Sequence, residues 1–164
     1  MSNELRLRLL LADEDATVRL ARLLAASQPD PAVVYLGGNL GAGKSTLARA
    51  WLRSLGVEGT IRSPTYTLVE RYRLGDSEAL HLDLYRIGSG AELEFLGLDE
   101  APARLWLVEW PERGAGGLPA ADLEVGLAIS GSGREAVLRA GSEAGRGWLG
   151  ALADGGQLAA FPEP

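Results

Sequence analysis

The chain has 164 residues, of which 46% are hydrophobic and 23% are charged, a balance that predicts one globular domain with a real core. It has no cysteine and one histidine, which excludes disulfides, zinc–thiolate sites and histidine-rich metal sites. The formal net charge of −6 shows no basic footprint for DNA or RNA, so we expect any tRNA contact to be indirect, through a partner protein.

No apolar run has the length of a transmembrane helix, which needs about 20 apolar residues. The first six residues lack the apolar core of a signal peptide, because charged residues interrupt them. The sequence therefore predicts a cytoplasmic protein without membrane association.

The N-terminal part predicts a strand and then a helix. Residues 5–9 alternate leucine with arginine, as a half-buried strand does. Asp13 is the expected N-cap of a helix over residues 14–27, which Pro29 and Pro31 follow. Thr17 lies in the first turn of this helix, and spacing alone favours an ordinary surface position for it.

A glycine-rich stretch then dominates the sequence. It contains the pattern G-x-x-x-x-G-K-[ST] from Gly38 to Ser45, the signature of a phosphate-binding loop. The apolar run 33–36 before it predicts a buried strand, and the residues from about Lys44 to Gly56 predict a helix. Strand, glycine loop and helix form the arrangement that the motif requires.

The chemistry of phosphate binding explains these residue types. Glycines leave the backbone N–H groups bare and permit positive φ, and the helix N-terminus favours an anion. Lys44, which is the only lysine of the chain, would reach the β- and γ-phosphates, and the Ser45 hydroxyl would bind Mg²⁺. The expected nucleotide contacts in this loop are Gly38, Asn39, Leu40, Gly41, Ala42, Gly43, Lys44, Ser45 and Thr46.

The next segment predicts an antiparallel hairpin. Pro64 excludes a helix at the residue before it, and the alternation that follows predicts a strand through Arg73. Gly75 and Asp76 predict a turn, and residues 79–85 predict the second strand. A plain doubly wound fold would continue to another parallel strand instead, so the hairpin indicates a mixed sheet.

The second half predicts a helix over 89–98, a buried parallel strand over 105–109 and a flexible loop over 114–119. Two strands over 123–129 and 135–140 follow as a hairpin, and a short helix is expected over 148–152. We therefore expect a single domain over residues 1–153 and a loose C-terminal tail over 154–164.

Two acids lie at strand positions where they could hold Mg²⁺ or orient an attacking water. Glu109 ends an apolar strand, and Asp83 points the same way as His81 on its own strand. On spacing alone, each could also be an ordinary surface acid. Thr65 lies between the motifs, where nucleotide switches usually occur, and could sense a γ-phosphate.

Other residues near these motifs stay open on spacing alone. Trp110 could stack on a base or simply pack against the protein. His81 alone suggests little. The arginines that could contact phosphate, none of which spacing singles out, are Arg71, Arg73, Arg86 and Arg134.

Five sequence blocks resemble a known family when taken together. They are GNLGAGKST, SPTYTLVERY, HLDLYR, ELEFLGLDE and LVEWPE. Their order is similar to that in the bacterial ATPase family of tRNA threonylcarbamoyladenosine biosynthesis (TsaE, formerly YjeE), from about residue 11 to residue 140. The second and third blocks are far more specific than the glycine loop, which many unrelated proteins share.

The resemblance implies an α/β, P-loop NTPase-type domain with a mixed parallel and antiparallel sheet flanked by helices. It also implies an accessory ATPase that hydrolyses ATP to ADP and phosphate, weakly alone and faster with partners. The implied partners are the TsaD and TsaB proteins, whose complex transfers threonylcarbamoyl to the adenosine next to the tRNA anticodon. The family member would meet tRNA only through that complex.

The resemblance also assigns roles by position. The implied catalytic residues are Lys44, Thr65, Asp83 and Glu109, with Ser45 and Glu109 as Mg²⁺ ligands and Asp83 as the acid important for hydrolysis. Residues 63–65 form a switch-like segment, Thr17 matches a family threonine near adenine, and Trp110 follows the acid as in relatives.

The chain departs from the family at two positions of the glycine loop. Ser45 stands where relatives usually carry threonine, and both residues supply a hydroxyl to Mg²⁺. Asn39 replaces a common aspartate, which removes a negative charge near the phosphates.

Two other functions fit a phosphate loop. A small-molecule or nucleotide kinase would need an acceptor pocket and usually an arginine-rich lid, and residues 114–119 are too short and contain no arginine. A nucleotide-gated binding module without relevant turnover would use the same loop but would not need Asp83 for hydrolysis.

Overall fold

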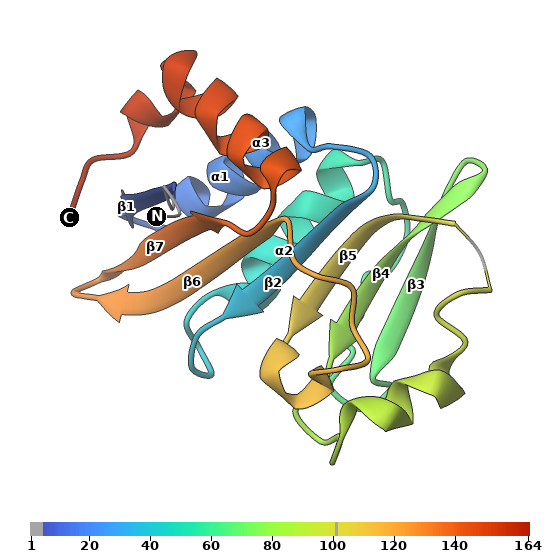
Figure 1. Cartoon of the computed structure of the whole chain (residues 1–164). Coiled ribbons are helices and arrows are strands. Elements are labelled where there is room, and N and C mark those ends of the chain that lie inside the picture. Colours follow the sequence, from blue (N-terminus) through green and yellow to red (C-terminus); the bar gives the residue numbers. More distant parts are fainter. Residues whose placement is uncertain (1–4, 101) are drawn as a thin grey trace.

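The computed structural model describes residues 5–100 and 102–164, which build one mixed seven-stranded sheet in the order β1-β7-β6-β2-β5-β4-β3 (Figure 1). The strands are β1 (Arg6–Leu11), β2 (Ala32–Gly37), β3 (Val69–Leu74), β4 (Ser77–Asp83), β5 (Ala103–Glu109), β6 (Leu123–Ser130) and β7 (Gly133–Ala140). The helices are α1 (Glu14–Ser27), α2 (Lys44–Ser54) and α3 (Glu143–Asp154), with short 3₁₀ helices η1 (Gly90–Leu96), η2 (Pro111–Gly114) and η3 (Gln157–Ala160).

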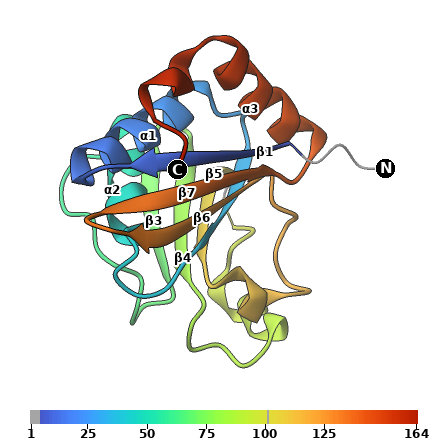
Figure 2. The same ribbon diagram turned by 90° about the vertical axis from the view of Figure 1, so that its left-hand side faces the viewer.

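The centre of the sheet is parallel and its margins are antiparallel. Strands β6, β2, β5 and β4 run parallel, while β1 and β7, β6 and β7, and β3 and β4 pair antiparallel. Figure 2 shows from the side how the helices lie over this sheet. Among the described residues no helix is both long enough and apolar enough to cross a bilayer.

Alternation along β5 separates two apolar cores on the two sides of the sheet. Leu105 and Leu107 belong to the core that α1, α2 and α3 build. Trp106 and Val108 contribute to a smaller core with η1. Glu109 continues the series of Leu105 and Leu107, so its side chain lies on the α2 side of the sheet.

Most predicted elements are confirmed, including the mixed sheet and both hairpins. Asp13 caps α1 as expected, because its carboxylate accepts a hydrogen bond from the backbone N–H of Ala16 at 2.8 Å. The N-terminal strand, the strand before the glycine loop and the helix after it also lie where the sequence placed them.

Several element boundaries differ from the sequence prediction, among them the second hairpin strand, predicted over 79–85 and observed over 77–83. Three other differences have a clear local cause. β3 begins only at Val69, because residues 64–67 form turns and Leu68 has a positive φ of 69°. The helix predicted over 89–98 is the shorter η1, which the left-handed Gly97 ends. α3 is longer than predicted, because the Ser142 hydroxyl caps it by accepting from the Gly145 N–H at 3.0 Å.

The prediction of a loose tail over residues 154–164 is wrong. Leu158 and Phe161 are buried in the larger core, where the Arg19 guanidinium lies 5.4 Å from the centre of the Phe161 ring. The backbone N–H of Leu10 donates to the Pro162 carbonyl at 2.7 Å, so the tail runs beside the edge strand β1. The isolated apolar residues of this segment have no periodicity, which is why its sequence gave no sign of packing.

The buried ring of Phe161 predicts a stability effect that a loose tail would not have. We expect Phe161→Ala to lower the free energy of unfolding by about 3 kcal/mol, the lower end of the range for a buried phenylalanine. Phe95→Ala is the matched control, since Phe95 is 87% exposed and Phe161 is 4% exposed. Urea denaturation followed by circular dichroism measures both, and equal midpoints would contradict the packed tail.

Candidate functional site

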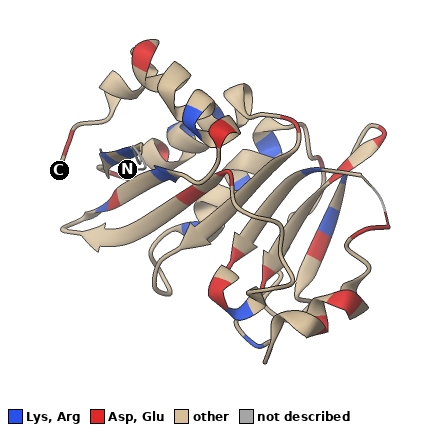
Figure 3. Cartoon of the chain, in the orientation of Figure 1, with Lys and Arg blue, Asp and Glu red and all other residues tan. Residues whose placement is uncertain are grey.

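The carboxyl ends of three neighbouring parallel strands meet at one edge of the sheet. Leu36 of β2 lies opposite Glu109 of β5, and Glu109 lies opposite Asp83 of β4. Figure 3 shows acidic residues at the arrowheads of β4 and β5 in this region. Because open α/β sheets bind ligands outside the carboxyl ends of their strands, this edge is the candidate site.

The glycine loop (residues 38–45) leaves β2 at this edge and enters α2. Gly38, Gly41 and Gly43 have φ values of 134°, 81° and 109°, which other residue types rarely adopt. A Cβ at Gly38 would lie 2.4 Å from the Leu127 carbonyl oxygen, so close packing also requires glycine there. The motif residues therefore form the turn that the sequence predicted.

The backbone donors around the start of α2 are free. No side chain caps α2, and the N–H groups of residues 43–46 have no acceptor within the described chain. The Leu47 N–H is the first to bond back, to the Gly43 carbonyl at 3.0 Å. Free N–H groups at a helix N-terminus form a ready anion site.

Lys44 begins α2 and is buried, with no ion pair among the described residues. Its ammonium lies 4.4 Å from the centre of the Trp110 ring. Trp110 has a positive φ of 55°, and its ring also packs on Tyr85 with centroids 5.0 Å apart. Trp110 therefore packs against Lys44 of the glycine loop and against Tyr85.

A cavity of about 250 Å³ lies beside the glycine loop. Thr17 lines it together with Thr46 and Arg134, and Thr17 is only 4% exposed. Spacing alone had favoured a surface position for Thr17, and this is wrong. Thr17 instead faces the space beside the glycine loop.

Arg134 of β7 supports the glycine loop through two hydrogen bonds to its backbone carbonyls. Its Nε donates to the Ala42 carbonyl and its Nη2 to the Gly41 carbonyl, both at 3.1 Å. The sequence offered Arg134 only as a candidate phosphate contact. Its position could not be found from the sequence, because it lies 92 residues beyond Ala42. Arg71, another such candidate, instead pairs with Glu78 and bonds carbonyls of the η1 segment.

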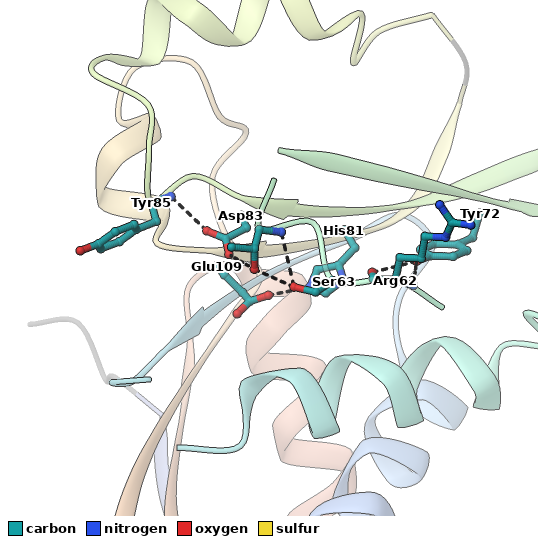
Figure 4. Close-up of polar contacts among 8 residues, drawn as sticks. Arg62, Ser63, Tyr72, His81, Asp83, Tyr85 and Glu109 are labelled. Carbon is teal, nitrogen blue, oxygen red and sulfur yellow. Dashed lines mark hydrogen bonds and ion pairs between the residues drawn. The ribbon is translucent and has the colours of Figure 1, made fainter. Parts of the chain in front are cut away.

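Asp83 joins the switch-like segment to the carboxyl edge (Figure 4). Its Oδ1 accepts from the Tyr85 N–H at 3.0 Å, and its Oδ2 accepts from the Thr65 hydroxyl at 3.4 Å. The Ser63 hydroxyl lies 2.7 Å from that of Thr65. The structure thus brings the predicted residues Thr65 and Asp83 together.

Tyr72 of β3 anchors the chain just before the switch-like segment. Its hydroxyl accepts from the Arg62 N–H at 3.1 Å and donates to the Arg62 carbonyl at 3.2 Å (Figure 4). Burial raises the pKa of Tyr72 above its usual value of 10.0, so the hydroxyl keeps its proton at neutral pH. Sequence reasoning did not identify this residue, because nothing in an alternating strand marks such a contact.

Glu109 has a partner that the sequence analysis passed over. The His81 Nε2 lies 2.8 Å from the Glu109 Oε2, and both side chains are buried (Figure 4). His81 precedes Asp83 by two residues and lies on the same face of β4. Its position within the HLDLYR block, two residues before Asp83, is the signal that could have identified it.

The oxygens at this edge suit Mg²⁺, which prefers oxygen ligands and retains several waters. Ser45 is exposed, and its hydroxyl has no partner within the described residues. Those residues contain no group of three or more His, Asp or Glu side chains that could hold a metal ion. The donors therefore fit an ion shared with ligand phosphates rather than one that the protein binds alone.

The comparisons with known proteins agree with this geometry. The family model "Threonylcarbamoyl adenosine biosynthesis protein TsaE" matches residues 11–136. The TsaE protein of Haemophilus influenzae is 38% identical over 139 residues, which cover 83% of this chain and 88% of the relative. TsaE of Synechocystis is 39% identical over 117 residues, which cover 68% of this chain and 74% of that protein.

A solved structure supports the same conclusion at the level of the fold. The crystal structure of Bacillus subtilis YdiB superposes with a TM-score of 0.74 at 26% identity, covering 94% of this chain and 97% of YdiB. The predicted P-loop NTPase-type α/β fold with a mixed sheet is confirmed. This chain belongs to the TsaE family of tRNA threonylcarbamoyladenosine biosynthesis proteins.

Proposed function

We propose that this chain is an accessory ATPase of that pathway, which hydrolyses ATP to ADP and phosphate while associated with the TsaD–TsaB transferase. One observation carries the proposal. The free N–H groups of the glycine loop, the unpaired ammonium of Lys44, and the carboxylates of Asp83 and Glu109 all lie at one edge of the sheet.

Binding of ATP would use groups that form no hydrogen bond or ion pair within the described residues. The N–H groups of residues 43–46 and the Lys44 ammonium supply donors and positive charge for the β- and γ-phosphates. The cavity beside Thr17 would take the base. Trp110 holds the Lys44 side chain in its buried position, where a phosphate would be a stronger partner than a ring.

Mg²⁺ would be held by Ser45 and Glu109 together with the phosphates. When bound, it would offset the negative charge that develops on the transferred phosphoryl group. Glu109 is suited to this role because only its Oε2 has a hydrogen-bond partner among the described residues.

Asp83 would act on the attacking water. Water adds to the γ-phosphorus, the bond to the bridging oxygen of ADP breaks, and the proton of the water passes to phosphate. The carboxylate of Asp83 is fixed by the Tyr85 N–H and reaches Thr65, so it is positioned to orient that water. Thr65 lies in an exposed segment, which a γ-phosphate or a partner protein could order.

The kinase alternative would need a lid that is free to close, whereas Ala115 and Gly117 lie against the backbone of Gly90. A Cβ at Gly117 would lie 2.3 Å from the Gly90 carbonyl oxygen. This loop is therefore packed in place, and it has no arginine to offer a phosphate.

The site predicts that Lys44 is essential for turnover. We expect Lys44→Ala to lower ATP hydrolysis by at least about 100-fold, because it removes a fixed positive charge from the developing phosphate charge. The assay measures phosphate release by the purified protein alone and with TsaD–TsaB, which should stimulate the wild type but not the Lys44→Ala variant. Arg49→Ala is the control, since Arg49 is exposed on the same helix. No stimulation by partners, or phosphate transfer to a small acceptor, would contradict the proposal.

The two hydrogen bonds from Arg134 to the glycine loop predict a separate effect on the affinity for ADP. Arg134→Ala should weaken ADP affinity roughly tenfold, because hydrogen bonds from a charged donor contribute about 1.5–3 kcal/mol each and part of the loss falls on loop order. Isothermal titration calorimetry measures this affinity. Arg139→Ala on the same strand is the matched control, because its ion pair with Glu124 is exposed and 3.6 Å long. Equal losses of ADP affinity in the two variants would show that the Arg134 hydrogen bonds do not shape the loop.

A further inference from the structure

His81 is the one buried imidazole of the chain, and the proposed hydrolysis does not yet use it. It is 3% exposed, and its Nε2 lies 2.8 Å from the Glu109 Oε2. Its other ring nitrogen, Nδ1, is buried without a hydrogen-bond partner among the described residues. A buried polar side chain that makes a single contact, and makes it with a functional carboxylate, requires an explanation.

The contact joins a ring nitrogen to a carboxylate oxygen. A hydrogen on His81 Nε2 can donate to the Glu109 Oε2, which is an acceptor. This hydrogen bond ties the ring on β4 to the carboxylate on β5.

The same bond limits the freedom of Glu109. A glutamate has three side-chain torsions, and a carboxylate at the end of a strand can otherwise turn away from the site. Fixing Oε2 on β4 holds the carboxylate plane and leaves Oε1 without a partner among the described residues. Strand pairing keeps the two residues in place, because Leu107 lies opposite His81 and Glu109 lies opposite Asp83.

We infer that His81 is a positioning residue, which holds Oε2 of Glu109 so that Oε1 is presented to the Mg²⁺ of the bound nucleotide. The inference rests on the proposed nucleotide site and adds a specific function for this histidine. Partners that orient the ligands of a metal typically change its affinity about 10–100-fold when they are removed. His81 does not itself touch nucleotide or metal in this assignment.

The test separates the metal from the nucleotide. The probe is N-methylanthraniloyl-ADP, whose binding is followed by fluorescence in EDTA and across a series of Mg²⁺ concentrations. His81→Phe keeps a flat ring and removes the donor. We expect it to raise the Mg²⁺ concentration for half-maximal effect at least tenfold, following the effect of such partners on metal affinity. Affinity in EDTA should stay at the wild-type value.

A conservative variant and a double mutant supply the controls. His81→Gln places an amide N–H near the position of Nε2, so it should return the Mg²⁺ requirement toward the wild-type value. In a Glu109→Gln background, His81→Phe should add nothing to the Mg²⁺ requirement, because the oxygen that it positions is no longer a carboxylate oxygen. Thermal unfolding of every variant reports on structural damage.

The outcomes distinguish a failure of the role inferred for His81 from a failure of the proposed function. If His81→Phe lowers the unfolding temperature and the affinity in EDTA but leaves the Mg²⁺ requirement unchanged, His81 is structural and the inference is wrong. An additive effect in the Glu109→Gln background also overturns it. If the wild type binds no nucleotide under any condition, the proposed function fails, and the inference fails with it.

Discussion

The register of the three parallel strands β2, β5 and β4 is the constraint on which the site depends. It places Leu36, Glu109 and Asp83 side by side at the end of the sheet. Successive side chains of a strand point to opposite faces, so a slip of one residue would send Glu109 to the η1 side. The apolar core prevents such a slip, because Leu105 and Leu107 must face α1 and α2. Hydrophobic packing of neighbouring strand residues thus fixes the positions of the two carboxylates.

Burial gives each polar group of the site a defined partner. A charge that leaves water is stable only where other groups compensate it. Glu109 has His81, Asp83 has a backbone N–H and a hydroxyl, and Lys44 has, among the described residues, only the face of Trp110. Of these three charges, the lysine is therefore the least compensated by the part of the chain that the structure describes. An anion bound beside it would complete its environment, in keeping with the proposed nucleotide site.

The sequence was sufficient for features that short stretches determine. The glycine loop, the cap at Asp13, the hairpins and the strand ending in Glu109 all follow from local pattern, and the structure confirms them. Features that depend on distant contacts were missed. No spacing connects Arg134 to Ala42 or Tyr72 to Arg62, because in each pair a strand residue meets a loop that only the folded chain brings beside it. Thr17 was misplaced for the same reason, since the cavity that covers it is built partly by β7.

The tail has a consequence for how copies of the protein behave toward one another. β1 is an edge strand, and an uncovered edge offers free backbone groups to any neighbouring chain. The Pro162 carbonyl occupies one of these groups, the Leu10 N–H, and proline cannot donate to a further strand. The contact at Pro162 therefore disfavours pairing of β1 with a strand of another chain. Removal of the segment around Pro162 would leave the Leu10 N–H at this edge without its partner.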